Sequence, residues 1–179
     1  MIRRWLGAAM FGLLCGLLAW QVTLANFPSV LMRLAVGRIA SQGGAINAFV
    51  HAPLVTAKSR AIVRPSPDLL YSSCPYDVSS APLLIDAVPV DAPYWSLSIF
   101  DAQTNAVFVH NNQRGLAPLK VAVLTAGQTA PAGYAPVPVK GARGVALIRI
   151  LIDRGAPITV IDAARRATRC RLAGQGRRT

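Results

Sequence analysis

The longest uninterrupted apolar stretch in the chain runs from Trp5 to Ala25 and contains no charged residue. As an α-helix, this stretch would span about 30 Å, the thickness of a bilayer's hydrocarbon core. Trp5 and Trp20 lie near its two ends, where aromatic side chains favour the membrane interface. The pattern therefore predicts a transmembrane anchor.

A cleaved signal peptide is the alternative interpretation of the same segment, with Thr23-Leu24-Ala25 as the cleavage site. Signal peptides usually have an apolar core of about 7–15 residues, and the longer core here favours an uncleaved anchor. Arg3 and Arg4 precede the segment, and a short basic tail normally stays on the cytoplasmic side. Both interpretations carry the rest of the chain across a membrane.

After the anchor the apolar spacing becomes helical. Apolar residues recur at steps of three and four, at Leu31, Leu34, Ala35, Ile39 and Ala40. Gly43 and Gly44 end this pattern, and a second apolar piece from Asn47 to Ala57 is broken by Pro53. We interpret the two pieces as linker helices that pack on the following domain. The alternative is an amphipathic helix that lies on lipid, with its arginines at the headgroup phosphates.

Beyond residue 64 the period changes to two, which is typical of half-buried strands. Trp95, Leu97 and Ile99 share one face of the clearest strand, and Ser96 and Ser98 share the other. The candidate strands are Leu69–Ser73, Leu83–Val90, Trp95–Phe100, Ala106–His110, Leu119–Leu124, Tyr134–Val139 and Val145–Ile152. This series of short strands favours a mainly β domain, a β-sandwich or jelly-roll-like fold, over alternating α/β.

A final helix is predicted after Pro157, with an apolar side formed by Ile161, Ala164, Thr168 and Leu172. Gly174 is its expected end. We therefore expect a basic tail and anchor at residues 1–27, a helical linker at 28–63, a β-rich domain with its C-terminal helix at 64–174, and a basic tail at 175–179.

The chain is strongly basic, with 19 Lys and Arg residues against seven acidic residues. Such a balance favours anionic partners. A domain across a membrane does not meet nucleic acid, and no aromatic residue follows Tyr134 among the later arginines. Arg165, Arg166 and Arg169 are therefore candidate contacts for anionic lipid headgroups or for an acidic patch on a partner. A solvated face without a dedicated ligand is the alternative.

Motifs for phosphate binding and for a serine nucleophile elbow are absent from the sequence. With only His51 and His110, we expect no metal site and no cofactor. A relay of Ser72 or Ser96 with His110 and Asp101 can be drawn, but nothing in the spacing selects it.

Polar residues near the strand ends are the better candidates for a site. A pocket would form if Asp68, Tyr71, Asp101 and Asn105 converged across neighbouring strands, with Tyr94 or Trp95 as an apolar wall. The alternative role for the two aspartates is to make turns, because Asp and Asn side chains bind nearby backbone N–H groups.

The three cysteines form no metal-binding pattern. Cys15 lies within the apolar segment. If the domain is exported, Cys74 and Cys170 would meet an oxidising compartment, where they could form one disulfide or remain as two buried thiols.

Several segments together resemble a bacterial family catalogued as domain of unknown function 1254. They are Pro65-Ser66-Pro67-Asp68-Leu69-Leu70-Tyr71-Ser72, Asp77-Val78-Ser79, Val88-Pro89, Tyr94-Trp95-Ser96 and Phe100 to Asn105, with a later strand and helix from Gly144 to Asp162. The likeness covers roughly residues 45 to 172. It departs from the long form of the family at Ser66, where asparagine is usual, and in lacking a second half.

The resemblance implies a β-sandwich of jelly-roll type and a partner subunit rather than a reaction. Longer members continue into a companion, domain of unknown function 1214. Short anchored forms resemble a subfamily in which that companion is a separate membrane protein. We therefore expect a single-pass protein of the bacterial inner membrane, with a cytoplasmic N-terminus and a periplasmic domain for binding or assembly. The alternative is an envelope hydrolase with a pocket around Asp68, Tyr71, Asp101 and Asn105.

Overall fold

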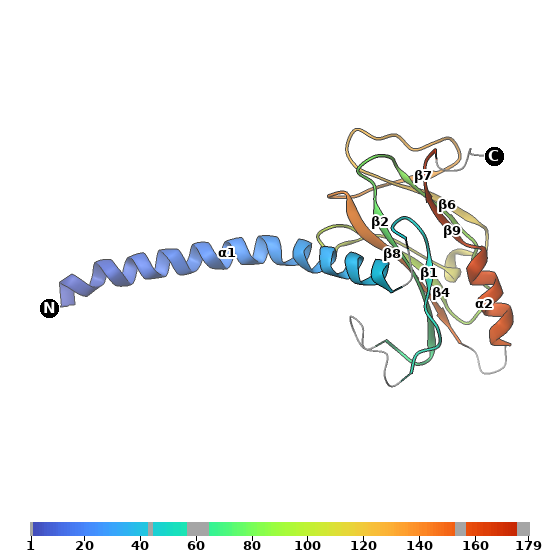
Figure 1. The fold of residues 1–179 in the computed structure, drawn as a ribbon, viewed down its shortest axis with the longest axis horizontal. Coiled ribbons are helices and arrows are strands. Elements are labelled where there is room, and N and C mark those ends of the chain that lie inside the picture. The colour runs from blue at the N-terminus through green and yellow to red at the C-terminus, as the bar shows by residue number, and fades with distance from the viewer. Residues whose placement is uncertain (1, 43–44, 57–64, 153–156, 175–179) are drawn as a thin grey trace.

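A computed structural model describes the whole chain except residues 1, 43–44, 57–64, 153–156 and 175–179. Its elements are α1 (Ile2–Ser41), β1 (Val50–His51), β2 (Leu69–Asp77), β3 (Leu83–Ala87), β4 (Trp95–Phe100), β5 (Ala106–Asn111), the 3₁₀ helix η1 (Asn112–Arg114), β6 (Leu119–Leu124), β7 (Ala135–Pro138), β8 (Arg143–Leu151), α2 (Ile158–Ala167) and β9 (Arg169–Leu172). Figure 1 shows a long helix that extends away from a β-rich domain.

The domain consists of two sheets that share one hydrophobic core. The first sheet has the order β1-β2-β8-β4-β5 and the second has the order β7-β6-β3-β9. All strand pairs are antiparallel except β6 with β7. The core draws on both sheets, through residues such as Trp95, Leu97, Ile148, Leu83 and Val121. The predicted mainly β fold with an N-terminal apolar helix and a C-terminal helix is confirmed.

The strand pattern of the sequence explains the core. Trp95, Leu97 and Ile99 are fully buried between the sheets, as their alternation predicts. Each of the seven predicted strands is present with adjusted ends. β1 and β9 were not predicted. β1 lies in the second predicted linker helix, and β9 lies in the last turn of the predicted C-terminal helix.

Helix α1 runs without a break through Pro28, so the anchor segment and the first predicted linker helix form one helix. Its 40 residues correspond to a length of about 60 Å. The helix is long and apolar enough to cross a membrane, and its apolar part is not buried in the protein.

The last turns of α1 pack on the outer face of the first sheet. Met32 and Val36 are buried there against Val145, with Ile39 and Phe100 beside them. The contacting stripe therefore differs from the predicted one, because Leu31 and Leu34 are exposed. This part of the sequence has apolar residues on most sides of the helix, so spacing alone did not identify the buried side.

Candidate functional site

The residues of the predicted pocket lie at opposite ends of the first sheet. Asp68 precedes β2, and its carbonyl oxygen accepts a hydrogen bond of 2.8 Å from the N–H of Ile152. Asp101 follows Phe100, which pairs with Val145 at the other end of β8. Seven residues of extended strand separate Val145 from Ile152, a distance of about 23 Å. The predicted convergence is therefore not observed.

The other pocket residues divide in the same way. The carbonyl oxygen of Tyr94 accepts a hydrogen bond from Leu151 N–H at 2.8 Å, which places Tyr94 at the Asp68 end. Tyr71 is also near that end, where its hydroxyl accepts a hydrogen bond from the N–H of Ser66 at 3.0 Å. Asn105 lies beside Asp101.

Asp101 holds the turn between β4 and β5. Its Oδ1 accepts hydrogen bonds from the backbone N–H groups of Gln103 and Asn105, both at 2.9 Å. Its Oδ2 accepts one from the Asn105 side chain at 3.1 Å. Thr104 adopts a φ of 65°, which the turn requires. Asp101 is almost fully buried, and both of its carboxylate oxygens accept hydrogen bonds from within the turn. The structure therefore supports the turn-making interpretation.

A tyrosine of β2 supports this turn across the intervening strand β8. The hydroxyl of Tyr76 donates a hydrogen bond of 2.9 Å to the carbonyl oxygen of Phe100. Burial raises the pKa of Tyr76, and the negative charge of Asp101 raises it further. The hydroxyl therefore stays protonated and acts as a donor.

The serine relay that can be drawn from the sequence, but that no spacing selects, is not assembled either. Ser72 Oγ lies 2.9 Å from Nδ1 of His51 rather than near His110, whose ring meets Trp95 edge-on at 6.2 Å. Ser72 is 1% exposed, so no substrate reaches its hydroxyl in this conformation. Asp101 lies at the far end of the sheet. We assign the contact between Ser72 and His51 to packing between β1 and β2.

Arg165 is buried instead of exposed, contrary to its predicted role as a surface contact. Only 3% of it is accessible. Its Nε donates to Asp162 at 2.6 Å, Nη1 donates to the carbonyl oxygen of Tyr71 at 2.8 Å, and Nη2 donates to that of Ala52 at 3.0 Å. One guanidinium thus joins α2, β2 and the segment after β1.

Arg166 and Arg169 are exposed, as predicted for contacts with an anionic surface. Arg166 donates to Asp162 at 2.8 Å. However, α2 lies on the side of the domain opposite to the free part of α1 (Figure 1). In this arrangement α2, which carries Arg166, lies on the side of the domain away from any membrane that the free part of α1 crosses, which disfavours lipid headgroups as its ligand.

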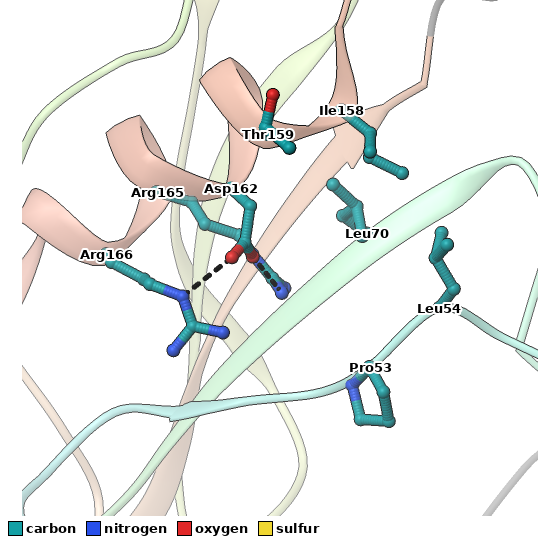
Figure 2. Close-up of a pocket in the computed structure, with 8 residues that line it drawn as sticks. All are labelled: Pro53, Leu54, Leu70, Ile158, Thr159, Asp162, Arg165 and Arg166. Carbon is teal, nitrogen blue, oxygen red and sulfur yellow. Dashed lines mark hydrogen bonds and ion pairs between the residues drawn. The ribbon is translucent and has the colours of Figure 1, made fainter.

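A groove of about 250 Å³ lies between α2 and β2 (Figure 2). Its walls are largely apolar, and the charged pair of Asp162 and Arg166 lies at its edge; the lining residues are Pro53, Leu54, Leu70, Ile158, Thr159, Asp162, Arg165 and Arg166. No pattern in the sequence indicates this groove, because its walls come from three distant segments.

Arg165 and Arg166 help to lower the pKa values of two titratable groups near this groove. The hydrogen bond from Arg166, followed by that from Arg165, lowers the pKa of Asp162. Burial lowers the pKa of His51, and the charges of Arg165 and Arg166 lower it further. At neutral pH, Asp162 is therefore ionised and already bound to two arginines, and His51 is neutral. Among the described residues, no group of three or more His, Cys or Asp side chains could hold a metal ion.

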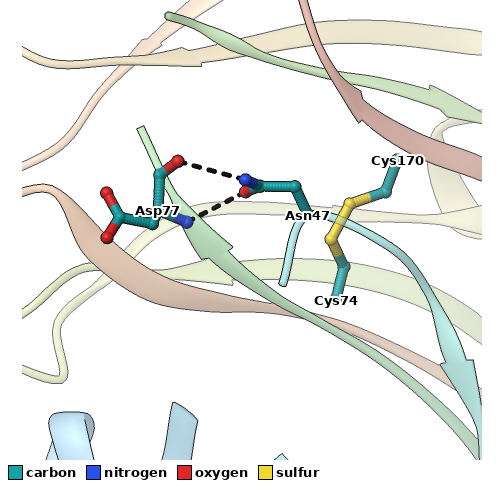
Figure 3. Close-up of a disulfide and its surroundings, with 4 residues drawn as sticks. All are labelled: Asn47, Cys74, Asp77 and Cys170. Carbon is teal, nitrogen blue, oxygen red and sulfur yellow. Dashed lines mark hydrogen bonds between the residues drawn. A yellow bond between two sulfur atoms is a disulfide. The ribbon is translucent and has the colours of Figure 1, made fainter. Parts of the chain in front are cut away.

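The structure joins Cys74 of β2 to Cys170 of β9 by a disulfide (Figure 3). The two Cα atoms are 6.7 Å apart, and the bridge connects the two sheets through the core. Close to the disulfide, the Asn47 side chain makes two hydrogen bonds with the backbone of Asp77 at the end of β2. Its Oδ1 accepts a hydrogen bond from Asp77 N–H at 2.9 Å, and its Nδ2 donates one to the Asp77 carbonyl oxygen at 3.3 Å. Cys15 is exposed on α1.

Comparison with solved structures identifies proteins of the same fold. The VPA0106 protein from Vibrio parahaemolyticus matches with a TM-score of 0.63 and 15% identity, over 81% of this chain and 35% of that protein. An uncharacterized protein from Burkholderia cenocepacia matches with a TM-score of 0.51 and 17% identity, over 77% of this chain and 38% of that protein. The chain thus spans little more than a third of either protein.

A search of curated protein sequences found no match. The model of the family described as "Protein of unknown function (DUF1254)" matches residues 46–172, which include all the strands of both sheets. The chain belongs to this family.

Proposed function

We propose that the chain is a membrane-anchored binding or assembly module whose β domain faces the bacterial periplasm. The observation that carries this proposal is the single helix α1, which is apolar and free over its first part and packs on the first sheet over its last part. A helix of this kind holds the domain at a fixed position beside a bilayer. Such a tether suits a protein that meets its partner at the membrane.

The disulfide supports export of the domain. Cys74 and Cys170 are buried in the core, and their bridge connects β2 to β9. Structural disulfides persist in oxidising compartments such as the periplasm and are rare in the cytosol. Arg3 and Arg4 at the start of α1 favour a cytoplasmic N-terminus, which gives the same orientation.

A partner is supported by the family resemblance, which implies a companion protein. The two solved proteins of this fold are more than twice as long as the region that matches this chain. The partner that we propose is a separate membrane protein of the family called domain of unknown function 1214.

Purification of the tagged full-length protein from membranes in a mild detergent tests this proposal. We expect a second membrane protein in fixed stoichiometry, and we expect the complex again when the tag is placed on the second protein. Recovery of this chain by itself, with turnover of a small molecule, would contradict a binding or assembly role.

A further inference from the structure

A row of three polar side chains crosses the outer face of the first sheet. In the strand register, Ser96 of β4 pairs with Asn111 of β5 on one side and with Arg149 of β8 on the other. Directly paired residues point to the same face of a sheet, with Cβ atoms about 5 Å apart. This face is opposite to the core, because Trp95 and Leu97 on either side of Ser96 point inward.

Each member of this row has a buried polar atom without a hydrogen-bond partner. These atoms are Nε of Arg149, Oγ of Ser96 and Oδ1 of Asn111, and none finds a partner within the described part of the chain. Ser96 is 0% exposed, so a ligand reaches its hydroxyl only in a conformation in which neighbouring side chains have moved aside. Buried polar groups in proteins are nearly always hydrogen-bonded, so three unpaired atoms on adjacent strands are unusual.

Within the part of the chain that the structure describes, Arg149 also lacks a counter-charge. Its recorded hydrogen bond is a long one, from Nη2 to Ser98 Oγ at 3.4 Å. Several other arginines of the domain are paired with carboxylates, in the pairs Arg143–Asp77, Arg165–Asp162 and Arg171–Asp86. None of the ion pairs among the described residues includes Arg149, although its side chain is half-buried.

We propose that Arg149, Ser96 and Asn111 form a binding site for a carboxylate that carries an N–H or O–H donor one or two carbon atoms away. The Nε–H of Arg149 and the hydroxyl of Ser96 donate to the carboxylate oxygens, and Asn111 Oδ1 accepts from the adjacent donor. A planar guanidinium edge matches the two oxygens of a carboxylate. The weak bond to Ser98 is the contact that Arg149 gives up when the ligand enters. This site is independent of the proposed partner.

Thermal unfolding of the detergent-solubilised full-length protein tests the site. The probes are sodium glycolate, a small hydroxy acid, and N-acetyl-aspartyl-N-methylamide, which represents an aspartate side chain of a protein. Sodium acetate lacks the neighbouring donor, and sodium chloride controls for ionic strength. At about ten times its Kd, a bound probe raises Tm by roughly 4 °C. We expect this rise with glycolate or the aspartyl amide, and a smaller rise with acetate.

Variants separate specific binding from a general salt effect. Arg149→Gln removes the charge, and Ser96→Ala tests the same site without a change in charge or much change in volume. Arg143→Gln is the matched control on the same strand and face, and it keeps the wild-type response. A larger rise with glycolate assigns the site to a free hydroxy acid, and a larger rise with the aspartyl amide assigns it to a protein carboxylate. No rise over chloride, or equal rises in wild type and both site variants, would overturn the proposal.

Discussion

Nη1 of Arg165 in α2 donates a hydrogen bond of 2.8 Å to the carbonyl oxygen of Tyr71 in β2, a residue 94 positions earlier in the chain. The same guanidinium binds Ala52 and Asp162. Because these contacts replace water around a buried cation, they position α2 on the first sheet and set one wall of the groove in Figure 2.

Replacement of Arg165 by methionine keeps much of its volume but leaves the carbonyl oxygens of Tyr71 and Ala52 without these donors. We expect a loss of about 3–5 kcal/mol in the free energy of unfolding, as is typical when one member of a buried charged network is removed. Thermal or urea unfolding of the full-length protein in detergent measures it. Arg166→Gln is the control: this side chain is 54% exposed, so its loss should cost less than about 1 kcal/mol. Equal effects of the two substitutions would contradict the assigned role of Arg165.

The burial of Arg165 is a feature that the sequence does not specify. Spacing on the predicted helix placed Arg165 with Arg166 and Arg169 on a polar side. Whether a charged side chain is buried depends on acceptors supplied by distant segments, here the carbonyl oxygens of Ala52 and Tyr71. Local patterning contains no information on such acceptors.

Gly144 of β8 lies against the neighbouring strands. A Cβ atom at this position would collide with the carbonyl oxygen of Phe100 and with the ring and hydroxyl of Tyr76. Gly144→Ala must therefore displace either the backbone of β4 or the Tyr76 side chain, and we expect it to destabilise the domain by about 1–3 kcal/mol. Gly37→Ala in α1 is the control, since it enters open space in a helix and should be neutral or slightly stabilising. The difference in Tm between the two variants measures the effect, and an unchanged Tm in Gly144→Ala would contradict this packing.

The Cys74–Cys170 bridge closes a loop with a sequence separation of 96. The chain-entropy model assigns such a bridge about 4–5 kcal/mol, so Cys74→Ser should lower Tm strongly and make it insensitive to reductant. Thiol titration of unreduced, denatured wild-type protein should detect Cys15 only. Three reactive thiols per chain would show that the bridge does not form.

His51 should make stability depend on pH in the weakly acidic range. Burial and the nearby arginines lower its pKa from 6.5 in the folded state, so the unfolded chain binds a proton more readily. Its stabilising contribution is therefore complete above pH 6.5 and is lost as the pH falls through the lowered folded-state pKa. Urea unfolding between pH 7.5 and about pH 5 should show this loss in wild type. His51→Asn, which can still contact Ser72, should show a smaller slope, and an identical slope would contradict the assignment.

The strands that the sequence predicted are those with strong alternation, such as the residues around Trp95 and Val121. β1 and β9 were missed because they are short and each acquires strand geometry by pairing with an existing strand, β1 with Ser72 and Ser73 and β9 with the exposed edge of β3. The predicted pocket failed for a related reason. The predicted pocket grouped residues near strand ends without knowledge of the strand order. The observed order places Asp68 and Asp101 at opposite ends of one sheet.

We propose that α1 anchors the chain in a membrane with the β domain outside. A protein carrying Cys15→Ser and Ser80→Cys has one free thiol, at an exposed position of the domain, because Cys74 and Cys170 are bridged. A membrane-impermeant maleimide applied to intact spheroplasts should label this thiol, and the labelled chain should remain in membranes after washing with alkaline carbonate. The matched variant with Cys15→Ser and Ile2→Cys should be labelled only after lysis. Labelling of Ser80→Cys only after lysis, or release of the chain by the wash, would contradict the account.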